Sequence, residues 1–111
     1  MNRYLALLIL LAAAVLEAGG DAIVRSGLHA SGGLRRGAYV LTGGAVLLAY
    51  GVVVNTPPWD FGRLLGLYVV FFFVVAQLIA WLVFQQPPSQ GVLLGGAFIV
   101  AGGLIISFAS M

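Results

Sequence analysis

Four apolar segments follow one another along this chain, separated only by short polar breaks. We predict helices over residues 4–24, 37–54, 64–84 and 91–110. A helix needs about 20 apolar residues to cross roughly 30 Å of hydrocarbon, and each segment is close to that length. Lipid cannot hydrogen-bond an exposed backbone, so only helices or closed barrels span it, and barrel strands of about 10 residues are much shorter than these segments. The sequence therefore predicts an all-α membrane protein with four transmembrane helices.

The composition agrees with this fold class and excludes several functions. Hydrophobic residues make up 62% of the 111 residues and charged residues 7%, which is too little polar surface to cover a soluble globule. The breaks are too short to hold a second domain, so we expect one transmembrane domain over residues 1–111. The first residues imitate a signal peptide, but the apolar character continues past residue 17, and we expect this segment to remain as the first span.

Enzyme and nucleic-acid functions find no support in the residue types. The chain has no cysteine and a single histidine, His29, which lies in a Gly/Ser-rich break and is expected to be solvated. No nucleophile-and-base set, phosphate-binding loop or group of metal ligands can be recognised, so we predict no enzyme, no metal and no cofactor. The five basic residues are spread over both ends of the spans, which argues against nucleic-acid binding.

Glu17 is the exception within the first apolar segment. An ionised carboxylate in hydrocarbon costs about 2.5–3.5 kcal/mol on insertion scales, so we expect it to face a protein interior or a water-filled cavity. Such residues commonly take part in ion or substrate movement. The alternative is a structural glutamate that pairs with a polar donor from another helix.

Two more charged residues share the helix face of Glu17. Asp21 and Arg25 follow at intervals of four residues, a spacing that lines up side chains along one face. We expect Asp21 to pair with Arg25 near the membrane boundary. Alternatively, the three residues form a polar path from the aqueous edge to Glu17.

The distribution of arginines leaves the orientation of the chain open. With four spans, Arg3 and Arg63 lie on one side of the membrane, whereas Arg25, Arg35 and Arg36 lie on the other. Positive residues favour the cytoplasmic side, but a difference of one residue is too small to fix the topology. This leaves open that the chain inserts both ways, which would permit an antiparallel homodimer.

Small residues mark the faces where helices approach closely. In the last segment, Gly95 and Gly102 are seven residues apart, and Gly96 and Gly103 repeat that spacing. Glycine lets two backbones approach in lipid, so these four residues predict a close helix contact, either between subunits or inside one subunit. Gly43, with its small neighbours, predicts close packing of the second span as well.

Several short strings, taken in order, resemble the small multidrug resistance superfamily. They are LEAGG at residues 16–20, WLVFQQ at 81–86, LG at 94–95 and AGGLII at 101–106. Arg25 matches a basic position at the end of the family's first helix, and Gly62-Arg63 followed by Tyr68 is closest to the YnfA-like branch. The resemblance covers nearly the whole chain. It implies a protein of the bacterial-type inner membrane that works as an antiparallel dimer.

The resemblance also implies a mechanism and a set of site residues. Two copies of Glu17 would share a cavity and alternately bind protons and a cation, and glycines of the last helix would make the dimer contact. Burial and a second nearby carboxylate both disfavour the charged form, so protons and cations can compete there. Asp21 departs from the family, in which this position is expected to be neutral.

The third span departs further from the drug exporters. It lacks their central glycine pair, and Tyr68 is the one aromatic residue that we predict at the site, as a cation–π contact. Gln77 is predicted to line the cavity. We therefore expect a proton-coupled exporter, or antiporter, of a compact cation rather than of large planar dyes. The alternative is a non-transporting membrane protein that binds a partner or lipid through its glycine faces.

Overall fold

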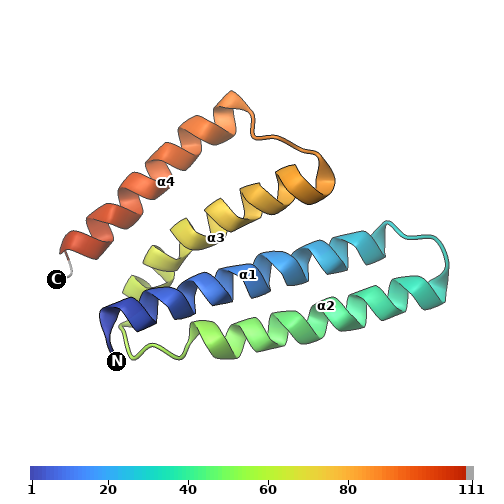
Figure 1. Ribbon diagram of the computed structural model, residues 1–111, viewed down its shortest axis with the longest axis horizontal. Coiled ribbons are helices and arrows are strands. Elements are labelled where there is room, and N and C mark those ends of the chain that lie inside the picture. The colour runs from blue at the N-terminus through green and yellow to red at the C-terminus, as the bar shows by residue number, and fades with distance from the viewer. Residues whose placement is uncertain (110–111) are drawn as a thin grey trace.

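The protein folds into four long helices without a sheet, over the residues 1–109 that the computed structural model describes. The helices are α1 (Arg3–Leu28), α2 (Gly33–Val54), α3 (Phe61–Phe84) and α4 (Gln90–Ala109), as Figure 1 shows. All four are long and apolar enough to cross a membrane. The predicted all-α fold with four spans is confirmed. Residue 110, the predicted end of the last span, lies outside the described residues.

The first three helices are longer than the apolar segments that predict them, because polar residues continue them at their ends. The first begins at a cap in which the backbone N–H of Tyr4 donates to the side chain of Asn2 over 2.7 Å. It ends at Leu28 and is followed by the cap residue His29, whose Nδ1 lies 2.9 Å from the carbonyl oxygen of Arg25. Hydropathy detects only the part of a helix that lies in hydrocarbon, so these interfacial turns are missed.

Helices α1 and α2 pack closely along each other, and glycines of both helices face each other. A Cβ added at Gly43 would lie 2.6 Å from Cγ2 of Val24 and 2.9 Å from the carbonyl oxygen of Gly20. Gly44, the next residue, would meet no such atom within 4 Å. The predicted close packing of the second span is thus made by one face of α2. Beside it, α1, α2 and α3 share a core of Leu10, Ala13, Ala14, Val54, Leu64, Leu67 and Tyr68.

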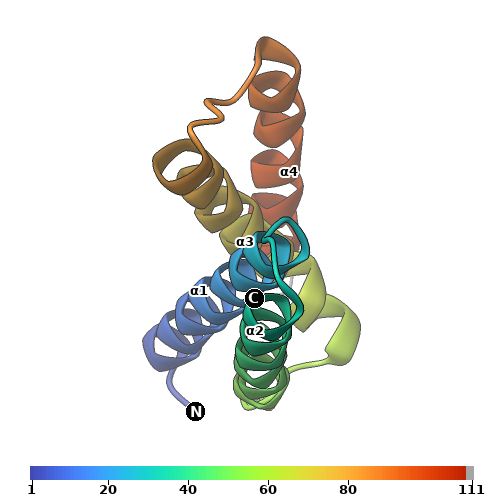
Figure 2. The same cartoon turned by 90° about the vertical axis from the view of Figure 1, so that its right-hand side faces the viewer.

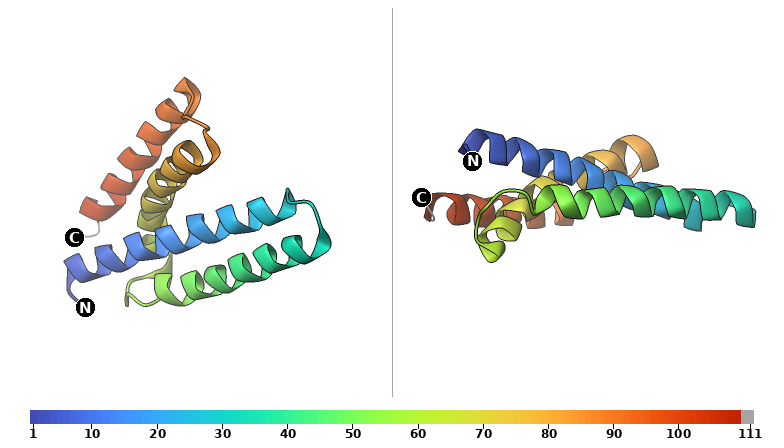
Figure 3. Two further views of the ribbon diagram at one scale, coloured as in Figure 1. Left: turned by 45° about the vertical axis from the view of Figure 1, so that its right-hand side comes forward. Right: turned by 90° about the horizontal axis from the view of Figure 1, so that it is seen from below.

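The last helix stands apart from the first two. In Figures 1 and 2 and in the left view of Figure 3, α4 leans away from the α1–α2 pair, and α3 lies between them. Among the described residues, α4 packs along α3 only, and a side-chain hydrogen bond of 3.0 Å joins Arg3 to Ser107 at the ends of α1 and α4. The four helices therefore do not close into one bundle within residues 1–109. No hydrophobic effect drives helices together in lipid, so a helix can keep one neighbour only.

The two glycine pairs of α4 have different surroundings. A Cβ added at Gly96 would lie 2.5 Å from the ring of Phe73, and one added at Gly103 would overlap Val70, so both face α3 of the same chain. Gly95 and Gly102 face open space, because neither would meet an atom of another element within 4 Å. Consecutive residues differ by about 100° around a helix, which separates the pairs onto two faces. Gly96 and Gly103 thus pack within one subunit, the alternative to a dimer contact.

Candidate functional site

The carboxylate of Glu17 is held from the neighbouring helix. The hydroxyl of Tyr68 in α3 donates a hydrogen bond to Oε1 of Glu17 in α1, over 2.8 Å. Tyr68 is 4% exposed and belongs to the core, whereas Glu17 is half-buried. The small residues Ala13 and Ala14, one turn earlier on α1, are fully buried, so α3 approaches closely enough for this contact. Both residues were predicted for the site, and the structure brings them together.

A cavity of ≈ 260 Å³ opens beside this pair, lined by Glu17, Tyr50, Leu65, Tyr68, Val69 and Phe72. Three aromatic rings stand in sequence along it. The ring centres of Tyr50 and Tyr68 are 5.7 Å apart, and those of Tyr68 and Phe72 are 6.4 Å apart. The expectation that Tyr68 alone supplies an aromatic wall is therefore wrong.

Sequence reasoning missed Tyr50 and Phe72 for different reasons. Tyr50 is on α2, and its distance from Tyr68 depends on how three helices pack. Its one sequence signal is a hydroxyl within an apolar run. Phe72 follows Tyr68 by four residues, so helical periodicity already puts it on the same face as Tyr68.

Gln77 is not part of this cavity. It lies nine residues after Tyr68, which is about two and a half turns and therefore the opposite side of α3. There it lines an apolar cleft of ≈ 600 Å³ between α3 and α4, together with residues such as Phe73, Trp81 and Gly96. The structure does not bring Gln77 to Glu17 within one chain.

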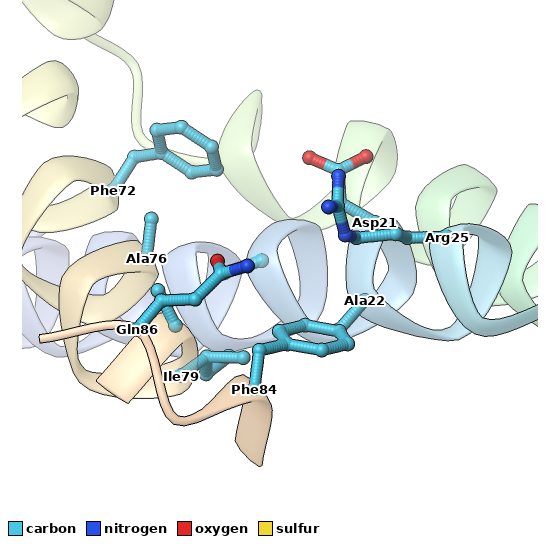
Figure 4. Close-up of a pocket in the computed structure, with 10 residues that line it drawn as sticks. Asp21, Ala22, Arg25, Phe72, Ala76, Ile79, Phe84 and Gln86 are labelled. Atoms are coloured by element: carbon cyan, nitrogen blue, oxygen red, sulfur yellow. The ribbon is translucent and has the colours of Figure 1, made fainter. Parts of the chain in front are cut away.

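Asp21 and Arg25 line a further cavity of ≈ 190 Å³ between α1 and α3, shown in Figure 4. The guanidinium of Arg25 lies over the ring of Phe84, 5.6 Å from its centre. Within residues 1–109, no ion pair joins Arg25 to Asp21, so the predicted pairing of the two is not formed. The aromatic ring at the end of α3 provides an alternative partner for the cation. Phe72 lines both cavities, so this one adjoins the Glu17 site.

The described part of the chain contains no candidate metal site. No group of three or more His, Cys, Asp or Glu residues gathers there. His29 caps the end of α1 and is exposed.

The chain is similar to bacterial membrane proteins over nearly its whole length. It is 33% identical over 101 residues to a UPF0060 membrane protein of Clostridium perfringens, covering 89% of this chain and 88% of the relative. The chain belongs to the UPF0060 membrane protein family. A second relative, UPF0060 membrane protein YfjF of Bacillus subtilis, is 30% identical over 104 residues, or 93% of each chain.

A third relative extends the match to 97% of each chain, with 28% identity over 110 residues: a UPF0060 membrane protein of Herpetosiphon aurantiacus. No family model matches the chain. No solved structure matches it significantly. The relatives and the four apolar helices together identify a multi-pass integral membrane protein.

Proposed function

We propose that this protein is a proton-coupled exporter of a small cationic compound, in which Glu17 alternately binds a proton and the cation. One observation carries the proposal: a carboxylate in the middle of a membrane span lines a cavity and receives a hydrogen bond from Tyr68. Ionisable residues in this situation are rare and usually mark ion or substrate pathways. The sequence resemblance to the small multidrug resistance superfamily supports the same reading.

The cavity has the chemistry that such an exchange needs. A carboxylate can accept about four hydrogen bonds, and Tyr68 uses one, so Glu17 keeps capacity for a proton or a cation. The faces of Tyr50, Tyr68 and Phe72 attract positive charge by cation–π interaction. The volume of ≈ 260 Å³ suits a compact cation. A proton that binds Glu17 removes the negative charge and releases the cation, which couples the two flows in opposite directions.

We further propose that the working unit is an antiparallel homodimer. Gly95 and Gly102 leave a small-residue face of α4 open to a second copy. The nearly balanced arginines permit insertion in both orientations. Pairing would bring two copies of Glu17 to a shared pathway, which one chain of four helices is too small to enclose alone.

The test is proton movement in liposomes that contain the purified protein. A gradient of a small cation, such as an alkylammonium, should drive protons the other way in the wild type, and Glu17→Gln should abolish this flux. Asp60→Asn is the matched control, because Asp60 is an exposed carboxylate at the start of α3, outside the cavity. Flux that survives in Glu17→Gln contradicts the proposal.

A second candidate is a membrane protein that binds a partner or lipid without transport. The apolar cleft of ≈ 600 Å³ between α3 and α4 favours it, because such a cleft can accept an acyl chain or a helix. The liposome experiment separates the two candidates. Wild-type protein that is folded and dimeric, but moves no protons with any cation of a broad panel, would favour this second function.

A further inference from the structure

The cavity that adjoins the Glu17 site contains charges of both signs. Figure 4 shows Asp21 and Arg25 of α1 at one side, Phe84 and Gln86 at the other, and Phe72 at the end shared with the Glu17 cavity. It is hollow because four alanines line it: Ala18, Ala22, Ala76 and Ala80. Its ≈ 190 Å³ is more than ten times the roughly 10–15 Å³ that one water needs. A small organic molecule can therefore enter it.

Neither charged group is neutralised by the other. Arg25 lies over Phe84, and its contact with a ring leaves its N–H donors able to bind an anion. Asp21 is exposed to the cavity and receives no hydrogen bond or ion pair within residues 1–109. A ligand that complements both groups must itself carry a positive and a negative charge.

The order of the charges along α1 sets the orientation of such a ligand. Arg25 is in the last turn of α1, at the membrane edge, and Asp21 lies one turn closer to Glu17. The positive end of the ligand therefore points toward Glu17 and the negative end toward water. A membrane phospholipid has the reverse order, because its phosphate lies between the acyl chains and the amine. The arrangement thus favours a molecule that enters from water.

We propose that this cavity receives the transported compound and that the compound is a small zwitterion, with an amine or guanidinium at one end and a carboxylate at the other. The proposal rests on the transport function proposed above and names its substrate class. The carboxylate would bind Arg25, and the cationic end would bind Asp21 and then Glu17. Four residues of helix rise by about 6 Å, which is close to the separation of the charges in an ω-amino acid such as 4-aminobutyrate.

The test compares three probes that share a four-carbon chain: 4-aminobutyrate, butylamine and butyrate. Binding to purified protein is followed by calorimetry, together with the protons released. In the wild type, 4-aminobutyrate should bind about tenfold or more tightly than butylamine, because Arg25 adds charge-assisted hydrogen bonds to the carboxylate. Arg25→Gln should remove this preference and leave the affinity for butylamine unchanged.

Arg35→Gln is the matched control, because Arg35 is an exposed arginine at the start of α2 that does not line this cavity. The control should keep the preference for 4-aminobutyrate. Asp21→Asn should weaken both amines and leave butyrate unaffected.

Equal affinities of 4-aminobutyrate and butylamine in the wild type would overturn the proposal, as would a preference that survives Arg25→Gln. Loss of the preference when phosphatidylethanolamine is added would also overturn it, because a lipid headgroup would then be the occupant. After any of these three results, the proposed exchange at Glu17 still holds if butylamine releases protons from the wild type but not from Glu17→Gln. Absence of proton release with every amine would instead contradict the transport function itself.

Discussion

Replacing Gly43 by alanine should separate α1 from α2. The new Cβ would lie 2.6 Å from Cγ2 of Val24, 2.9 Å from the carbonyl oxygen of Gly20 and 3.0 Å from the backbone nitrogen of Val24. Carbon atoms prefer a separation of roughly 3.5–4.0 Å, so the helices must move apart by about 1 Å. Two of the three atoms are backbone and cannot rotate away. Overpacking of this kind costs about 1–3 kcal/mol, which lowers the ratio of folded to unfolded protein by about 5- to 150-fold.

Gly44→Ala is the matched control, since a Cβ there meets no atom of another element within 4 Å. Both changes raise helix propensity by the same amount, so the difference between the variants isolates the packing term. Unfolding is measured by circular dichroism in micelles with increasing fractions of a denaturing detergent. Gly44→Ala should be as stable as the wild type or more stable, and Gly43→Ala clearly less. Coinciding unfolding curves of the two variants would refute the close contact between α1 and α2.

Three further predictions concern the dimer and the cavity. Gly102→Leu should lower the yield of cross-linked dimer in membranes without loss of fold. Gly103→Leu should instead displace α4 from α3, because its side chain would overlap α3. Equal dimer yields for Gly102→Leu and the wild type would place the contact elsewhere. Tyr68→Phe should lower substrate-driven proton flux about tenfold or more. The variant removes the hydrogen bond that Tyr68 donates to the charged Glu17 carboxylate, and such a bond is worth about 1.5–3 kcal/mol. Unchanged flux would show that this hydrogen bond has no part in transport. Tyr50→Ala should weaken binding of small alkylammonium ions about 2- to 30-fold, because one cation–π contact of about 0.5–2 kcal/mol is lost. Calorimetry checks this, and an unchanged affinity would exclude Tyr50 from the site.

Predictions that depend on one helix at a time agree well with the structure. The four spans follow from the length of the apolar segments, and the helix faces follow from periodicity. Glu17 lines a cavity, as expected from the cost of a charge in hydrocarbon. The helix ends differ, because polar interfacial residues continue a helix beyond the hydrocarbon.

Predictions that depend on how the helices pack against one another are less successful. The sequence does not tell which glycine pair of α4 meets α3, and the structure shows that Gly96 and Gly103 do, whereas Gly95 and Gly102 do not. Gln77 looks like a cavity residue because it is polar, but it lies on the side of α3 that faces α4. Arg25 has Asp21 one turn away and contacts Phe84 instead, because α3 ends beside α1.

The sequence by itself determined that this protein is a four-span helical membrane protein with a carboxylate in its first span. Hydrophobicity and helical geometry act along the chain, and both can be read from residue order. Only the tertiary structure decided that Tyr68 hydrogen-bonds Glu17, that Tyr50 and Phe72 complete the aromatic wall and that α4 leans away from α1 and α2. These arrangements arise from close contact between backbones and side chains of different helices. In lipid, where no hydrophobic force selects neighbours, such contacts depend on the shapes of the helix surfaces.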